Sequence, residues 1–332
     1  MLTDPQASAR PAAERLGSTN GHSDANNWGG ALINHGTLAL TNCTLAGNFI
    51  DGSGSGGAIE NLGTLSLTGC TLSGNGAGYA GAIRNEATCA LQNCTLSGNS
   101  VPSNGGAIDN VFGASLNLVY CTFSGNSAGS SGAGIDNFLS QVNLTNCIIA
   151  VEAGQDIYNW AGSTINGGGS NIVQSLVNAG GTVNGADTFL AADPLLAPMG
   201  NYGGPTQTLP PLPGSPAIDS AVGTTPNTDQ RGFPRPLGLA PDIGAVEGVL
   251  NLAGPGQLTG ATRLGNGSFQ FGFTNYTDAS FTVLATTNLA LPLTLWSILG
   301  GALESPVGSG QFQFTDPQAT NNATRFYGVR SP

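Results

Sequence analysis

Residues 56–75 read GGAIENLGTLSLTGCTLSGN, and the same order of residue types recurs along the first half of the chain. A cysteine stands at the same point of five consecutive segments, with spacings of 27, 24, 27 and 26 residues. An apolar residue lies two residues after each cysteine and three residues before it, and an Ile-x-Asn or Leu-x-Asn triplet lies further upstream. These cysteines are Cys43, Cys70, Cys94, Cys121 and Cys147. A nearly fixed period of this kind is the signature of a repeat architecture.

Each repeat contains three short segments in which apolar and polar residues alternate, separated by glycine, serine and asparagine. Alternation with period two is typical of β-strands, and the polar breaks are typical of turns. Because the same residue type returns at each position, we expect coils stacked in register, with apolar side chains inside and asparagines stacked at the bends. The sequence therefore predicts an all-β fold, a right-handed parallel β-helix of about six coils with three strands per coil.

The periodic pattern divides the chain into four regions. Residues 25–175 hold the repeats, and an irregular lead precedes them at 1–24. At 176–250 the period stops and proline is dense, so we expect a cap that blocks the sheet edge after the last coil. Residues 251–332 alternate apolar and polar again, which predicts a small β-sandwich-like module. The first full coil begins at Trp28 with none expected above it, and this open edge favours a piece of a longer chain.

Several motifs resemble those of known bacterial families. GGAIEN, AGAIRN and GGAIDN, followed by NCTLSGN or YCTFSGN, resemble the GGAI and FxxN repeats of chlamydial polymorphic outer-membrane proteins and related right-handed β-helix proteins, over roughly residues 25–160. Leucine replaces the phenylalanine of the second motif in most coils. DPLL, GNYGGPTQT, GSPAID, TDQRGFPRP and PDIGAVE resemble the choice-of-anchor Q segment that ends many secreted bacterial β-helix proteins. The last region is similar to the C-terminal modules of large secreted bacterial proteins.

These resemblances imply a secreted or cell-surface bacterial protein. They favour a structural, adhesive or glycan-contacting module without catalysis, whose partner is an extracellular polysaccharide or a cell-surface glycan. The start of the chain lacks the apolar segment of an export signal, so we expect that signal to have been lost upstream. We expect a monomer or a part of a longer chain, with no cofactor other than a calcium ion considered below.

The charge balance argues against several classes of partner. The eight basic residues are all arginine, against 19 acidic residues, which gives a formal net charge of −11. Nucleic acid and anionic membrane both attract basic surfaces, so neither is an expected partner. The chain contains no apolar run of about 18 residues, so we expect no transmembrane helix. Its glycine-rich runs lack the lysine of a phosphate loop, which argues against a nucleotide.

The cysteines are better explained as core residues than as chemistry. Stacked in one column they form a line, whereas a zinc site needs a tetrahedron of ligands. Cys89 stands in a different column, where the other coils have Leu38, Leu65, Leu116 and Val142. A thiol that replaces leucine behaves as a small buried hydrophobe. We therefore expect packing rather than disulfides between neighbouring coils.

The position between the Ile and the Asn of each triplet points outward and carries much of the charge of the repeats. In successive coils it holds Ile33, Glu60, Arg84, Asp109 and Asp136, and neighbouring members are expected about 4.8 Å apart. One hypothesis is a polysaccharide lyase or glycoside hydrolase, in which Arg84 binds a uronate and Asp109 and Asp136 act on the substrate or bind Ca²⁺. The alternative is a solvated column in which opposite charges offset one another.

Two other outward columns are candidates for contact with a ligand. Trp28 and Tyr79 occupy the same position of two different repeats, where aromatic faces at a groove edge would stack on sugar rings. Threonines form a second column directly after the cysteines, which suits an exposed strand. Its members are Thr44, Thr71, Thr95 and Thr122.

Overall fold

The computed structural model divides the chain into two compact units, Met1–Gly248 and Val249–Pro332. It describes residues 13–14, 17–19, 22–23, 28–224, 226–248, 259–274, 281–291, 295–304, 311–321 and 324–330. Within these residues the fold is β-structure, and the helical elements are the short 3₁₀ turns η1 (Ala186–Thr188) and η3 (Ala319–Asn321). No helix in the described part of the chain is long and apolar enough to cross a membrane.

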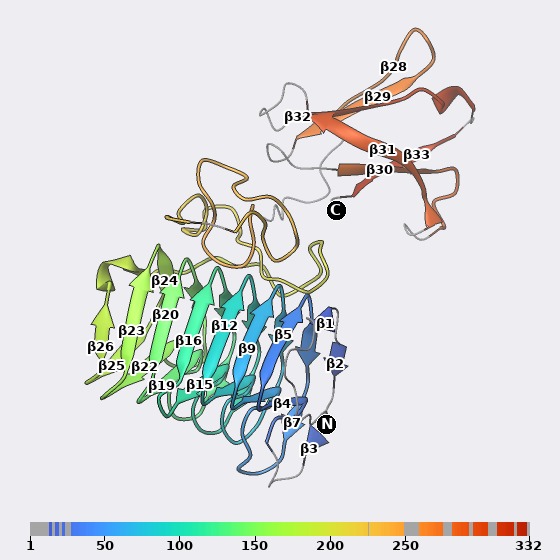
Figure 1. Ribbon diagram of the computed structural model, residues 1–332. Helices are drawn as coiled ribbons and strands as arrows, with labels where there is room; N and C mark the ends of the chain where they lie inside the picture. The colour runs from blue at the N-terminus through green and yellow to red at the C-terminus, as the bar shows by residue number, and fades with distance from the viewer. Residues whose placement is uncertain are drawn as a thin grey trace. The chain divides into compact units, whose positions relative to one another are not determined.

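The first unit is a parallel β-solenoid with three strands per coil, which confirms the predicted fold class (Figure 1). Sheet 1 contains β4 (Leu32–Asn34), β8 (Ile59–Asn61), β11 (Ile83–Asn85), β15 (Ile108–Val111), β19 (Ile135–Phe138), β22 (Ile157–Trp160) and β25 (Leu176–Ala179). Sheet 2 contains β1 (Ala13–Glu14), β5 (Thr37–Thr41), β9 (Thr64–Thr68), β12 (Thr88–Gln92), β16 (Ser115–Val119), β20 (Gln141–Thr145), β23 (Thr164–Gly168) and β26 (Thr182–Asn184). Sheet 3 contains β2 (Gly17–Thr19), β6 (Thr44–Ala46), β10 (Thr71–Ser73), β13 (Thr95–Ser97), β17 (Thr122–Ser124), β21 (Ile148–Ile149), β24 (Asn171–Val173) and β27 (Phe189–Leu190).

The register between coils matches the columns read from the sequence. Ile59 pairs with Ile83, and Ile83 pairs with Ile108. Cys89 pairs with Leu65 on one side and with Leu116 on the other, as its column predicted. The interior is one continuous apolar core that contains the cysteines, all of which are buried. The interpretation of the cysteines as core residues is therefore confirmed.

Two ladders of buried asparagines brace the bends, again as predicted. In the first ladder the Asn61 side-chain amide donates to Asn85 Oδ1 at 2.7 Å, and Asn85 donates in turn to Asn110 Oδ1 at 2.8 Å. In the second ladder Asn75 donates to Asn99 Oδ1 at 2.9 Å, and Asn99 donates to Asn126 Oδ1 at 2.9 Å. Each amide therefore satisfies its neighbour, so these polar groups are buried without a large penalty.

The proline-rich segment packs along a face of the solenoid, rather than across its end as the sequence had suggested (Figure 1). Gln230 Nε2 donates to Thr71 Oγ1 at 2.9 Å, and Thr95 Oγ1 donates to Gln230 Oε1 at 2.6 Å. The backbone amide of Ala245 donates to Thr122 Oγ1 at 2.9 Å. The expectation of an exposed threonine column is therefore wrong for β10, β13 and β17, where these three threonines are buried. Regularly spaced hydroxyls satisfy polar groups that an irregular segment cannot pair internally.

The solenoid also extends further than the repeats seen in the sequence. At its end, β25 to β27 form another coil that runs to Leu190. At its start, β1 and β2 pair in parallel with β5 and β6, and β3 (His22–Ser23) pairs with β7 (Phe49–Ile50). The expectation that nothing lies above the coil of Trp28 is therefore corrected.

The second unit is a single antiparallel sheet that curves into a half-barrel. Its strand order is β28 (Thr259–Arg263), β29 (Phe269–Thr274), β32 (Gln311–Asp316), β31 (Ser297–Glu304), β30 (Phe281–Thr286) and β33 (Phe326–Arg330). Alternate residues of β29 point inward, so Phe271 and Phe273 join Phe281, Val283 and Phe312 in its core.

Candidate functional site

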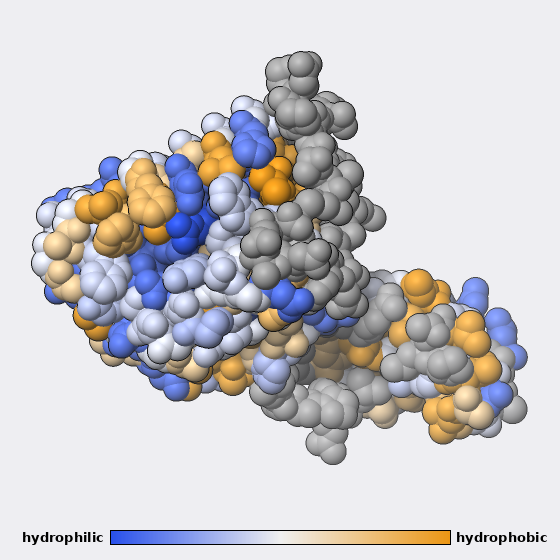
Figure 2. All heavy atoms as spheres, turned by 90° about the horizontal axis from the view of Figure 1, so that it is seen from below, coloured by the Kyte–Doolittle hydropathy of each residue, from blue (hydrophilic) through white to orange (hydrophobic). Residues whose placement is uncertain are grey.

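A groove of about 450 Å³ runs over the outer face of sheet 1. One wall consists of residues that precede the strands of this sheet, including Trp28, Ser55 and Tyr79. The other wall consists of residues at the ends of the strands or just after them, including Phe112 and Trp160. The space-filling view from below shows hydrophilic side chains in a hollow of the solenoid, with hydrophobic side chains beside it (Figure 2).

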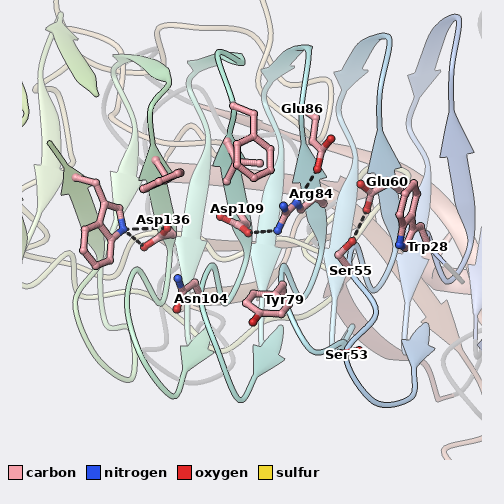
Figure 3. Close-up of a pocket in the computed structure, with 14 residues that line it drawn as sticks. Trp28, Ser53, Ser55, Glu60, Tyr79, Arg84, Glu86, Asn104, Asp109 and Asp136 are labelled. Carbon is pink, nitrogen blue, oxygen red and sulfur yellow. Dashed lines mark hydrogen bonds and ion pairs between the residues drawn. The ribbon is translucent and has the colours of Figure 1, made fainter. Parts of the chain in front are cut away.

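The charged column read from the sequence forms the floor of this groove (Figure 3). Glu60 pairs with Arg84 in β11, Arg84 pairs with Asp109 in β15, and Asp109 pairs with Asp136 in β19. The column is not solvated as the alternative to the enzyme hypothesis supposed, because the exposed fractions of Glu60, Asp109 and Asp136 are only 2%, 2% and 1%. The second part of that alternative, the offset of opposite charges, holds for Arg84 and Asp109, which form an ion pair. The walls on either side shield the carboxyl groups of this column from water. This burial cannot be read from the sequence pattern of the strands alone.

Arg84 is held between two carboxyl groups. Its Nη1 donates to Asp109 Oδ2 at 2.6 Å, and its Nε donates to Glu86 Oε1 at 3.2 Å. The guanidinium carbon also lies 5.5 Å from the centre of the Phe112 ring, within range of a cation–π interaction. Arg84 is thus already engaged by three neighbours, which partly offset its charge before any uronate arrives.

The other two acids of the column accept hydrogen bonds from neutral donors. Glu60 Oε2 accepts from the Ser55 hydroxyl at 2.8 Å. Asp136 Oδ1 accepts from the Ser131 hydroxyl at 2.6 Å and from the indole Nε1 of Trp160 at 3.0 Å. The carboxyl oxygens of Asp109 and Asp136 therefore accept hydrogen bonds from different partners. A Ca²⁺ ion between the two groups would compete with Arg84 for Asp109 and with the Ser131 and Trp160 donors for Asp136.

One oxygen of this floor has no partner. Asp109 Oδ1 is buried and accepts no hydrogen bond from any described residue. A buried carboxylate oxygen without a donor carries the full cost of its lost hydration. Asp109 lines the groove, so a ligand donor that displaced the side chains around this atom would find an acceptor without a partner.

Burial also changes the acidity of the floor. It raises the pKa of the Glu60 carboxyl to about 7, although the Ser55 hydroxyl and the Arg84 guanidinium both favour the charged form. It raises the pKa of Asp109 to about 7 against the opposing effect of Arg84, and the charge of Asp136 adds to the rise. The pKa of Asp136 is itself raised by burial. The groove therefore retains protons close to neutral pH, where ordinary carboxyl groups are ionised.

Aromatic rings stand on both walls. The structure brings Trp28 and Tyr79 into the same groove as the charged column, and both are exposed. On the opposite wall Phe112, Phe138 and Trp160 follow one another along the solenoid axis, with ring centres 6.2 Å apart at each step. This second row was not predicted from the sequence. Its signal is the residue directly after the triplet asparagine, which is Phe138 in one coil and Trp160 in the next.

The described residues contain no group of three or more His, Cys, Asp or Glu side chains that could hold a metal ion. The chain matches no model of a known protein family, no curated protein and no solved structure.

Proposed function

We propose that this chain is a secreted or cell-surface bacterial β-helix protein whose groove binds a glycan without cleaving it. The observation that carries the proposal is the pairing of aromatic walls with a buried polar floor in one groove. Sugar rings present apolar faces and polar edges, so binding sites for them combine flat aromatic surfaces with a few placed hydrogen-bonding groups.

The length of the groove suits an oligosaccharide. Trp28 precedes the first strand of sheet 1, and Trp160 lies in β22, five strand positions further along. At about 4.8 Å per strand this distance is ~24 Å, which is room for several linked sugar rings. A chain lying along the solenoid axis would meet an aromatic ring on one wall or the other along most of its length.

The resemblance of the motifs supports the proposed location. The GGAI-type repeats and the choice-of-anchor Q-like segment both resemble parts of secreted or surface-exposed bacterial β-helix proteins. A glycan-contacting or adhesive role accords with such a location.

One observation favours a second candidate, glycoside hydrolysis. Hydrolysis requires a protonated carboxyl group and an ionised one on either side of the scissile bond. Burial raises the pKa of Glu60 to about 7, so its carboxyl group is half protonated near neutral pH. Asp109, whose pKa is also raised to about 7 despite its ion pair with Arg84, would be half ionised at the same pH and would act as the partner. A lyase acting on uronates is less well supported, because the floor is acidic and Arg84 is already paired.

A glycan array probed with the full chain tests the proposal. We expect retention of selected glycans by the native protein, and at least tenfold weaker binding by Phe112→Ala, since this ring is 61% exposed in the groove wall. Phe49→Ala is the matched control, because Phe49 is exposed but lies outside this groove. A reducing-end assay on the retained glycans separates the two candidates. If the native protein cleaves a retained glycan and Glu60→Gln does not, hydrolysis replaces binding as the proposed function. If the array retains no protein, both candidate functions are wrong.

A further inference from the structure

The groove is lined by more acidic side chains than basic ones. Among the described residues that line it, Arg84 is the only basic side chain. Against it stand four acidic side chains, Glu60, Glu86, Asp109 and Asp136. Apolar walls and the burial of three of these acids strengthen the field of such a cluster, because water screens it poorly.

The arginine does not balance these acids. Its hydrogen bonds go to Asp109 and Glu86, whereas Glu60 and Asp136 accept only from hydroxyl and indole donors. Asp109 Oδ1 accepts from nothing in the described structure, although Asp109 is only 2% exposed. The floor therefore has a buried acceptor without a donor and an excess of acidic groups at the same place.

The groove already shows how it accommodates a cation. The Arg84 guanidinium lies 5.5 Å from the Phe112 ring centre while it donates to carboxyl oxygens. Other rings of the walls, on Trp28, Tyr79, Phe138 and Trp160, lie in the same groove as the unbalanced acids. An aromatic face next to a carboxylate is a favourable environment for an ammonium group, through cation–π attraction and a charge-assisted hydrogen bond.

We infer that the ligand of this groove is a glycan that carries unsubstituted amino groups, namely a polymer of amino sugars. This inference rests on the proposed glycan-binding function and names its substrate class. An ammonium group would donate to Asp109 Oδ1 and offset the charge of Glu60 and Asp136. A neutral glycan supplies hydroxyl donors but no charge, and an acidic glycan meets like charges on the floor.

Binding of a cation would also release protons. Glu60 is faced by Arg84, Glu86 and Asp109, with the Ser55 hydroxyl as its hydrogen-bond donor. A bound ammonium group adds a positive charge to this set, which lowers the pKa of the carboxyl groups and favours their ionised forms. Titration at about pH 5.5, where the amino groups of the ligand are already charged, should therefore release protons from the protein.

Three hexasaccharides with the same β-1,4 linkage test the inference by calorimetry on the full chain. They are the hexamers of glucosamine, N-acetylglucosamine and glucose, which differ only in the group at carbon 2. We expect the glucosamine hexamer to bind at least tenfold more tightly than the other two, with an advantage that shrinks at high salt. In buffers of different ionisation enthalpy, only this hexamer should show net proton release.

Two variants and one control locate the effect. Asp109→Asn and Glu60→Gln each remove one carboxyl group that a bound ammonium group would ionise, and each should reduce the preference for glucosamine by about tenfold or more. Asp187→Asn removes a charge from an exposed position elsewhere on the solenoid and should leave the preference unchanged. Equal binding of the three hexamers would overturn the inference while glycan binding stands. If no hexamer binds, the inference is wrong, and the glycan array then decides the proposed function separately.

Discussion

Arg84 Nη1 donates to Asp109 Oδ2 at 2.6 Å across the neighbouring strands β11 and β15. The second oxygen of the same carboxyl group, Oδ1, has no donor among the described residues. The pair therefore stabilises the floor of the groove and leaves one buried acceptor without a donor.

Loss of Arg84 should destabilise the solenoid. Arg84→Met leaves Asp109 buried without its ion pair, which costs about 3–5 kcal/mol when a buried pair is broken from one side. The free energy of unfolding in urea at pH 8 measures this loss. In the double variant Arg84→Met/Asp109→Leu, both charges are replaced by apolar groups, so most of the stability should return. A single variant that loses less than about 1 kcal/mol would show that the pair does not matter for stability.

The pKa of Glu60 predicts a dependence of stability on pH. It rises from an ordinary 4.5 to about 7 in the folded protein, so the folded state binds the proton more tightly than the unfolded chain. The resulting stabilisation is complete below about pH 4.5 and is lost as the pH rises through 7. Between pH 4.5 and 7.5 the native protein should therefore lose more free energy of unfolding than Glu60→Gln does. The free energy of unfolding of Asp187→Asn should change with pH as that of the native protein does. If Glu60→Gln also shows the native pH dependence, Glu60 is not the group responsible.

The second asparagine ladder should be essential to the stacking of coils. Asn99 Oδ1 accepts from the backbone and side-chain nitrogens of Asn75, and Asn99 Nδ2 donates to Leu72 O and Asn126 Oδ1. Asn99→Ala leaves several buried groups unpaired at about 1–3 kcal/mol each, so we expect a loss of at least 3 kcal/mol in urea unfolding. Asn184→Ala is the matched control, because Asn184 lies at the exposed end of a similar stack, where its side-chain amide donates to Asn166 Oδ1. Equal losses in the two variants would contradict the ladder interpretation.

The coil architecture was predictable because stacking in register gives equivalent residues equivalent environments. Ile83, Cys94 and Asn99 each recur in type at the same place of neighbouring coils, so the column alone indicates which side chains face inward. Cys89 opposite Leu65 and Leu116 shows that the column specifies an environment and not a chemical role.

The candidate site was only partly predictable, because burial of its floor depends on segments without the period. The repeat period places Glu60, Arg84 and Asp109 next to one another, and the structure confirms that register. Their burial comes from residues before and after the strands, such as Tyr79 and Phe112, which vary from coil to coil.

The position of the proline-rich segment was not predictable for a related reason. Gln230 reaches Thr71 and Thr95 from 159 and 135 residues further along the chain. Nothing in the local sequence of an irregular segment indicates which face of a solenoid will pair with its polar groups. The threonine column was the available signal, since it offers a row of hydroxyls to any segment that needs partners.

The most direct test of the account uses the tryptophans as reporters, because the chain has three. Trp28 and Trp160 line the groove, whereas Trp296 belongs to the second unit. Addition of the β-1,4-linked glucosamine hexamer should change the tryptophan fluorescence of the native protein and of Trp296→Phe. The change should be lost in the double variant Trp28→Phe/Trp160→Phe. If the double variant keeps the change and Trp296→Phe loses it, the ligand binds the second unit and the groove is not the binding site.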